Sequence, residues 1–270
     1  MKISLTESSF IGKEINEPYY YILLFDGQSS FSVNLIDYEC SGKNLLFLSP
    51  YQLLKWKSST APFIHLLSFH GDFYCIEYHK KEVACNGILF NNIYHEPFVT
   101  VPEFIYQEIL SIIERMQKVN ESELDYDNSI LKSYLQVILA LSSKEKQLKM
   151  APSIQESIGN GDILKFQLLL DTHFQKAKEV AFYASKYGVS VNTFSKKIKK
   201  LFGKSPSQLI QERIVLEAKK QLHLTFKPIR EIASDLNFED EFYFSRYFKK
   251  NVGVSPKEFR KEVGISIVAQ

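Results

Sequence analysis

One short text occurs twice in this chain: FSKKIKK, residues 194–200, returns as FSRYFKK, residues 244–250. At the same offset of fifty positions, GKSP at residues 203–206 returns as GVSP at residues 253–256. A short amphipathic run that contains one alanine also precedes each copy. The chain therefore contains one structural unit in two copies.

Each copy predicts a helix, a tight turn and a second helix. In the first copy, Gly188 tolerates the positive φ of a tight turn, and Ser190 is a typical N-cap for the helix that follows. In the second copy, Asn237 takes the place of the glycine. Glu239 or Asp240 then opens the helix, where a negative charge suits the helix dipole. Both copies thus carry the local signals of a helix-turn-helix unit.

The second helix of each copy is predicted to be buried on one side and basic on the other. Phe194, Ile198 and Leu201 fall on one face of the first of these helices by the i, i+4, i+7 rule. Phe244 and Phe248 take the same role in the second. An apolar anchor under a short basic helix, preceded by another helix across a tight turn, is the arrangement that fits a DNA major groove.

These residues resemble the AraC/XylS family of transcriptional regulators over residues 163–261. The resemblance is carried by the Phe202-Gly203 helix end, the helix from Arg213 to Leu222, the PIREIA run at residues 228–233 and the FSRYFK run at residues 244–249. Asn237 stands where that family usually has glycine, and Phe194 and Ile198 exchange the usual Leu and Phe. The resemblance implies a sequence-specific DNA-binding transcriptional regulator, which we expect to be an activator that responds to a small-molecule effector.

The resemblance also implies which side chains meet DNA. Those implied to face bases lie on the second helix of each unit: Asn192, Ser195, Lys196, Glu241, Phe242, Ser245 and Arg246. Those assigned to phosphate are Ser190, Lys199, Lys200, Lys249 and Lys250. Arg246 can bond a guanine through two atoms, whereas Lys196 at the equivalent position is a point donor, so we expect the second unit to be the stricter reader. The alternative is that Arg246 pairs with Glu239 or binds a phosphate.

Charge is divided unequally along the 270 residues. Residues 1–150 carry 13 Lys and Arg against 18 Asp and Glu, whereas residues 151–270 carry 20 against 13, so a net −5 precedes a net +7. A basic domain joined to an acidic one is expected if only the second domain meets phosphate. We therefore predict double-stranded DNA as the partner of the second half. The resemblance to AraC-type regulators implies RNA polymerase as a further partner.

Composition predicts a cytoplasmic protein without a membrane partner. The sequence has no run of eighteen apolar residues, and its N-terminus carries Glu7, Glu14 and Glu17 rather than a basic, apolar leader. Three cysteines, an odd and small number, fit a reducing compartment and no disulfide framework.

Residues 19–91 predict many short strands. YYYILLF at residues 19–25 ends at an Asp-Gly turn, FSVNL at residues 31–35 alternates with period two, and LLFL at residues 45–48 stops at Ser-Pro. This pattern predicts a small barrel or sandwich. The FLSPYQ turn at residues 47–52 also resembles the cupin-like sensor barrel of many AraC-type regulators. Aromatic residues of these strands are the candidate lining of an effector pocket, or else plain core: Tyr20, Phe25, Phe31, Phe47 and Trp56.

A barrel also raises the alternative of a cupin-type metal-dependent enzyme with a helical appendage. Cys75, Glu77 and His79 would share one face of a strand by their i, i+2, i+4 spacing, and His70 and Cys85 lie near them in sequence. The His-x-His pair of metal-binding cupins is missing from the sequence, and so are a Gly-rich phosphate loop and a Ser/His/Asp set. We therefore predict no catalytic residues, no metal and no cofactor.

After Pro102 the apolar spacing becomes helical. A second helix, at about residues 127–142, carries an apolar stripe made of Ile130, Leu131, Tyr134, Leu135, Ile138 and Leu141. The stripe could simply seal the barrel. AraC-type regulators, however, commonly form an antiparallel coiled-coil dimer through the helix after the barrel, so the resemblance implies a homodimer through these residues.

The sequence thus predicts an α+β protein of two domains. Residues 1–143 form the cupin-like sensing and dimerisation domain, with strands to about residue 100 and helices over about 102–142, and residues 144–157 form a polar linker. Residues 158–270 form the all-helical AraC-type DNA-binding domain, with helix-turn-helix units at about 177–202 and 228–250.

Overall fold

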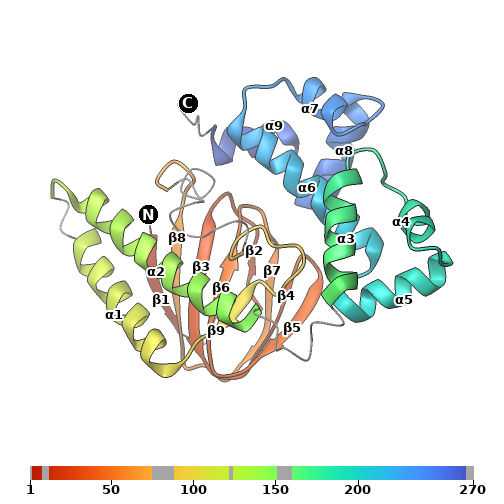
Figure 1. The fold of residues 1–270 in the computed structure, drawn as a ribbon. Helices are drawn as coiled ribbons and strands as arrows, with labels where there is room; N and C mark the ends of the chain where they lie inside the picture. The colour runs from red at the N-terminus through yellow and green to blue at the C-terminus, as the bar shows by residue number, and fades with distance from the viewer. Residues whose placement is uncertain (1, 8–11, 75–87, 122–123, 151–159, 266–270) are drawn as a thin grey trace. The chain divides into compact units, whose positions relative to one another are not determined.

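The computed structural model describes residues 2–7, 12–74, 88–121, 124–150 and 160–265. Contacts divide the chain into two compact units. The N-terminal unit holds residues 1–92 and 96–150, and the C-terminal unit holds residues 93–95 and 151–269. Figure 1 shows that the first unit is rich in strands and the second is helical, which is the α+β two-domain fold that the sequence predicts. No helix in the described ranges is both long and apolar enough to cross a bilayer.

The N-terminal unit contains two antiparallel sheets. The first has the strand order β1 (Lys2–Glu7), β8 (Phe63–Phe69), β3 (Tyr20–Asp26), β6 (Lys43–Leu48) and β9 (Phe98–Thr100). The second has the order β2 (Glu14–Ile15), β7 (Leu54–Ser59), β4 (Ser29–Val33) and β5 (Ile36–Cys40). The consecutive strands β4 and β5 pair across a tight turn at residues 34–35, whereas β3 pairs with β6, from which it is separated in sequence by two other strands.

Alternate residues of β3 enter two different cores. Ile22 and Leu24 join a core that also contains residues of the two helices that follow the strands. Leu23 and Phe25 point the other way, into a core shared with Trp56 and other residues of the second sheet. Because both faces of β3 are buried, the strand is apolar or aromatic at every position from residue 20 to residue 25 instead of alternating.

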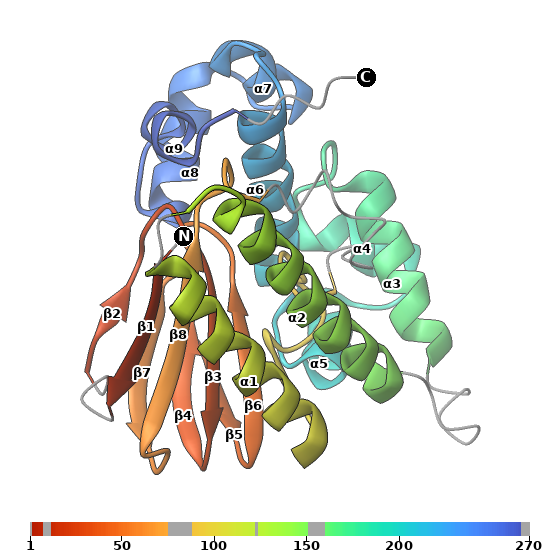
Figure 2. The same cartoon turned by 90° about the vertical axis from the view of Figure 1, so that its left-hand side faces the viewer.

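Helices α1 (Glu103–Asn120) and α2 (Asp127–Met150) cover the outer face of the five-stranded sheet (Figure 2). The apolar stripe of α2 faces this sheet. Leu131, Leu135 and Ile138 lie in the core between α1, α2 and the sheet, and Tyr134 and Leu141 are half-buried against it. The sequence left two interpretations of this stripe, packing against the strands or pairing with a partner helix, and in the structure its buried side chains pack against the sheet. The three buried side chains are therefore occupied within a single chain and are not a dimer face, because the sheet offers them a nearer apolar surface.

Helix α2 continues to Met150, into the segment predicted as a linker. Its last turns contain Lys146, which is only 4% exposed and whose Nζ donates to the carbonyl oxygen of Glu96 at 2.6 Å. Lysines in a polar run usually indicate a solvated segment, and a partner fifty positions away gives no local signal. The rest of the predicted linker, residues 151–157, lies outside the described residues.

The C-terminal unit, within the described ranges, consists of seven helices: α3 (Asn160–His173), α4 (Val180–Lys186), α5 (Val191–Phe202), α6 (Pro206–Leu224), α7 (Ile229–Asp235), α8 (Glu241–Val252) and α9 (Pro256–Val263). Helices α4 and α5 form the first helix-turn-helix unit, and α7 and α8 form the second. Helix α6 connects them and contacts α5, α7 and α8. The repeated text of the sequence therefore corresponds to repeated structure.

The repetition extends to the helix ends. Gly203 ends α5 with φ 69° and Gly253 ends α8 with φ 94°, a left-handed conformation that glycine adopts without a Cβ clash. Ser205 then caps α6 and Ser255 caps α9, each with a capping box and a proline at the first helical position. The same local chemistry thus ends one helix and begins the next in both copies.

Candidate nucleic-acid interface

Local hydrogen bonds set the start of each predicted recognition helix. The hydroxyl of Ser190 accepts from the backbone N–H of Thr193 at 3.2 Å and caps α5. The carboxylate of Asp240 accepts from the N–H of Tyr243 at 2.7 Å and caps α8, so Asp240 rather than Glu239 is the cap.

The turn before each recognition helix contains one residue with positive φ. This residue is Gly188, with φ 66°, in the first unit and Asn237, with φ 53°, in the second. Asparagine tolerates this region better than most non-glycine residues. The replacement of glycine by asparagine therefore leaves the second turn in the same conformation as the first.

The two recognition helices present the same pattern of accessible positions. Their anchors Phe194, Ile198, Phe244 and Phe248 are fully buried, and Leu201, predicted with them, is half-buried. The residues predicted to face bases lie away from these anchors: Asn192, Ser195 and Lys196 on α5, and Glu241, Phe242, Ser245 and Arg246 on α8. Among them, Asn192, Lys196, Phe242 and Arg246 are exposed, and the two serines and Glu241 are partly buried. The structure thus brings each predicted set together on one helix.

The residues predicted to bind phosphate are all exposed: Ser190, Lys199, Lys200, Lys249 and Lys250. The four lysines lie in the last turns of α5 and α8, where cations also suit the helix dipole. Lys197, which lies among them in sequence, points elsewhere, because its Nζ is 2.7 Å from the Asp162 carboxylate of α3.

Lys178 is a residue of this region that sequence reasoning missed. It precedes α4 of the first unit, yet its Nζ donates to the carbonyl oxygen of Asn237 at 2.7 Å and lies 3.4 Å from the centre of the Phe238 ring. Burial lowers the pKa of Lys178 to about 8. The Lys178 side chain thus connects the start of the first helix-turn-helix unit to the turn of the second. The two residues are 59 positions apart, and no local spacing in the sequence indicates their contact.

The aromatic residues predicted to line an effector pocket are divided between two cores. Tyr20 and Phe47 lie on the helix-covered side of the five-stranded sheet, and both rings contact Phe90. Phe25, Phe31 and Trp56 interlock between the two sheets, with ring centroids 5.1 to 6.4 Å apart. The five therefore do not share one core. Successive residues of a strand point to opposite faces of its sheet, so Tyr20 and Phe25, which are five positions apart on β3, lie on opposite faces.

The residues of the metal hypothesis fall almost entirely outside the described part of the chain. Cys75, Glu77, His79 and Cys85 lie within residues 75–87, which the structure does not describe. His70 is described, and its Nδ1 lies 3.2 Å from the Asp72 carboxylate. Within the described ranges, no group of three His, Cys, Asp or Glu side chains has the geometry to hold a metal ion.

Comparison with known proteins identifies the C-terminal unit. Residues 183–262, from α4 to α9, match a family model described as a helix-turn-helix domain. The virulence regulon transcriptional activator VirF of Yersinia enterocolitica is 23% identical over 252 residues, which are 89% of this chain and 88% of VirF. Residues 183–262 therefore form an AraC-type helix-turn-helix domain, and the curated relatives of the chain are transcriptional regulators of the AraC/XylS family.

Other comparisons cover less of the chain or are more distant in sequence. The HTH-type transcriptional regulator ExsA of Pseudomonas aeruginosa is 23% identical over 127 residues, so the match spans 47% of this chain and about half, 46%, of ExsA. The structure of ToxT from Vibrio cholerae O395 is 14% identical, with a TM-score of 0.41 over 97% of this chain and 98% of ToxT. VirF and ExsA carry the names of an activator and a regulator, and the alternative of a metal-dependent enzyme finds no support among them.

Proposed function

We propose that this AraC-type regulator activates transcription by placing α5 and α8 in two successive major grooves of double-stranded DNA. One observation carries the proposal: two capped helices of twelve residues present the same order of buried anchors and exposed polar positions. A single copy of this pattern would be an ordinary surface helix. Two copies, joined by α6, fit half-sites about one helical turn apart.

The proposed division of labour follows from side-chain chemistry. Asn192, Lys196, Glu241 and Arg246 offer donors and acceptors to base edges, and the exposed ring of Phe242 suits the methyl group of thymine. Ser195 and Ser245 add a hydroxyl at equivalent positions. Ser190 and the four terminal lysines supply the phosphate contacts, which fix the register of the protein but do not read sequence.

The proposal extends to three properties of the whole protein. The N-terminal unit binds a small-molecule effector, with the aromatic core of Phe25, Phe31 and Trp56 between the sheets as the supporting feature. The protein forms a homodimer and contacts RNA polymerase as an activator. It works in the cytoplasm, where it meets DNA.

The test is a selection of bound sequences from a random DNA pool with the full chain, followed by titrations in increasing salt. With about five or more phosphate contacts, the slope of log K against log salt should be near −5 or steeper. Changing Lys199, Lys200, Lys249 and Lys250 to Gln should make the slope shallower by about three to four.

The matched control is Lys118→Gln, which removes an exposed cation from α1 in the N-terminal unit and should leave the slope unchanged. A wild-type slope near zero, or a pool without enriched sequences, would contradict sequence-specific binding through this face.

A further inference from the structure

Three residues of the N-terminal half of the sequence belong to the DNA-binding unit. Ile93, Tyr94 and His95 group with the C-terminal unit, whereas their neighbours on both sides group with the N-terminal unit. Ile93 is 8% exposed and Tyr94 is partly buried. We call residues 93–95 the inserted segment. The C-terminal unit is therefore assembled from two separate stretches of the chain.

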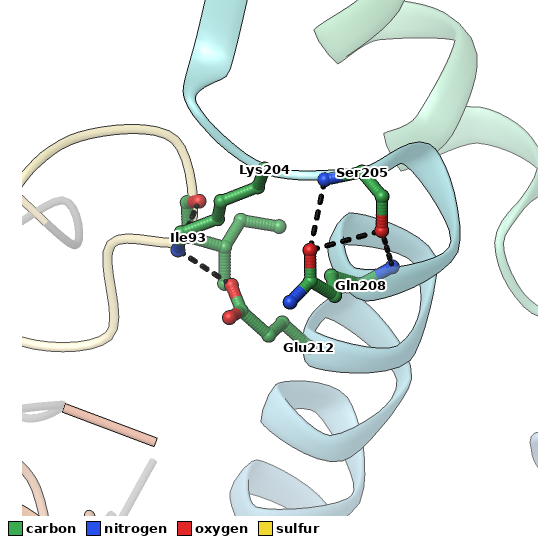
Figure 3. Close-up of polar contacts among 5 residues, drawn as sticks. All are labelled: Ile93, Lys204, Ser205, Gln208 and Glu212. Atoms are coloured by element: carbon green, nitrogen blue, oxygen red, sulfur yellow. Dashed lines mark hydrogen bonds and ion pairs between the residues drawn. The ribbon is translucent and has the colours of Figure 1, made fainter. Parts of the chain in front are cut away.

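The backbone of the inserted segment is held by a buried lysine. The Nζ of Lys204 donates to the carbonyl oxygen of Ile93 at 2.9 Å and to the carboxylate of Glu212, on α6, at 2.8 Å (Figure 3). The Lys204 side chain is 9% exposed. A buried cation is costly unless it is paired and hydrogen-bonded. Lys204 is paired and bonded only while Ile93 occupies this place and Glu212 faces it.

Lys204 occupies the short turn between two capped helix ends. Gly203, the residue before it, ends α5. Ser205, the residue after it, begins α6, and its hydroxyl and N–H bond Gln208 in the capping box that Figure 3 shows. The contact with Ile93 is therefore made at the C-terminal end of the first recognition helix.

The Tyr94 side chain of the inserted segment packs on the C-terminal end of α5. The ring of Tyr94 lies 5.8 Å from the ring of Phe202, the last residue of α5. Burial raises the pKa of the Tyr94 phenol, and the nearby Asp171 carboxylate raises it further while Arg213 lowers it. Asp171, on α3, and Arg213, on α6, are themselves joined at 2.7 Å. Tyr94 thus sits where α3, α5 and α6 meet.

The second helix-turn-helix unit has no equivalent arrangement in its sequence. Val252 stands at the position of Phe202, and Val254 stands at the position of Lys204. Neither valine offers a ring or an ammonium group. The second unit therefore lacks counterparts of Phe202 and Lys204, which makes it an internal control for the first.

We infer that the inserted segment positions the first recognition helix, with Tyr94 and Lys204 as positioning residues for base reading by α5. The inference rests on the proposed function. The turn and the Ser190 cap fix the N-terminal end of α5, and the inserted segment fixes its C-terminal end through Phe202 and the Lys204 turn. Loss of the contact leaves one end of α5 free to tilt, which moves Asn192 and Lys196 relative to base edges without unfolding the unit.

The experiment uses the full chain and a duplex selected from a random pool by the wild-type protein. Two variants first show which half-site each helix reads. The half-site in which Lys196→Ala loses base preference is assigned to α5, and the one in which Arg246→Ala loses it is assigned to α8. A mismatched base pair typically weakens specific binding by about tenfold or more. In Tyr94→Ala and Lys204→Met, mismatches in the α5 half-site should cost only about twofold, while those in the α8 half-site keep their wild-type effect.

Conservative variants separate positioning from general damage. Tyr94→Phe keeps the ring against Phe202 and should keep wild-type preference in both half-sites. Equal loss in both half-sites for Tyr94→Ala, or unchanged preference in the α5 half-site, would overturn the inference. Should Lys204→Met fail to fold, Tyr94→Ala alone decides, because it removes a ring and leaves the ion pair of Lys204 with Glu212 intact.

Amide hydrogen exchange without DNA provides the readout that does not depend on the proposed function. Tyr94→Ala should speed exchange in the last turn of α5 and leave α8 unchanged. If the wild-type protein selects no DNA sequence, the proposed function fails while the exchange result still decides whether the inserted segment holds α5. Unchanged exchange in α5 overturns the inference in either case.

Discussion

The sixth residue of each recognition helix is an exposed cation, Lys196 in α5 and Arg246 in α8. The two cations differ in what they can recognise. A guanidinium presents a planar fork that matches the O6 and N7 of guanine, whereas an ammonium is a point donor that accepts many partners. Because the two cations stand at equivalent positions on equivalent helices, we expect α8 to be the stricter reader of one base pair.

For this reason, Arg246→Ala should cost about 1–3 kcal/mol of binding free energy on the selected duplex and relax the preference at one base pair. Lys250→Ala, one turn further along α8 and assigned to phosphate, should weaken binding to all sequences alike. Titrations of both variants against the selected duplex and against random DNA measure the difference. If Arg246→Ala weakens both DNAs equally, Arg246 binds phosphate and its assignment to a base is wrong.

At the scale of an element, α2 contains one buried cation, the ammonium group of Lys146. Burial lowers the pKa of Lys146 to about 8 from an ordinary value of 10.5, and the nearby Glu96 carboxylate opposes the shift. Between about pH 8 and 10.5, the unfolded chain holds this proton and the folded chain has released it. Folding stability contributed by this group therefore rises with pH across that window and is lowest below it.

Lys146→Met should remove this dependence. The free energy of unfolding of the wild type, relative to that of the variant, should increase as pH rises from about 8 to 10.5. Denaturant titrations at several pH values measure it. Lys149→Met, which removes an exposed lysine of the same helix, should show no such trend. A wild-type advantage that stays constant across the window would mean that Lys146 keeps its proton in the fold.

At the scale of the whole molecule, burial of the inner stripe of α2 leaves a second apolar stripe on its outer side. Ile130 is 41% exposed and Val137 is 43% exposed, and Tyr134 and Leu141, which are half-buried against the inner core, border this stripe. The spacing of four, three and four residues is that of a coiled-coil seam. If the proposed homodimer forms through α2, this outer stripe is the surface that remains available to it.

Val137→Glu places a charge in the middle of the outer stripe and should raise the dissociation constant of the dimer by about tenfold or more. Sedimentation equilibrium over a range of concentrations measures this constant. Gln147→Glu adds the same charge to an exposed position of α2 outside the stripe and should leave the dimer intact. A wild-type protein that stays monomeric over the whole range, or a Val137→Glu dimer of unchanged strength, would contradict this interface.

The sequence by itself determined the helices of the C-terminal unit, because the interactions that begin and end them are local. A serine or aspartate cap, a residue tolerant of positive φ and an apolar pair four positions apart act within one or two turns of helix, so FSKKIKK and FSRYFKK already identify two recognition helices. The AraC-type helix-turn-helix domain predicted from these residues is confirmed.

Only the tertiary structure decided which of several apolar surfaces each segment meets. The apolar stripe of α2 could pack on a sheet or on a partner helix equally well. The order of residues in β3 does not predict which surface covers each of its two faces. The bond of Lys204 to Ile93 spans 111 positions, and no pattern of nearby residues encodes it. The physical reason is the same in each case: caps and turns are satisfied by neighbours in sequence, whereas burial is satisfied by whatever surface the rest of the chain brings close.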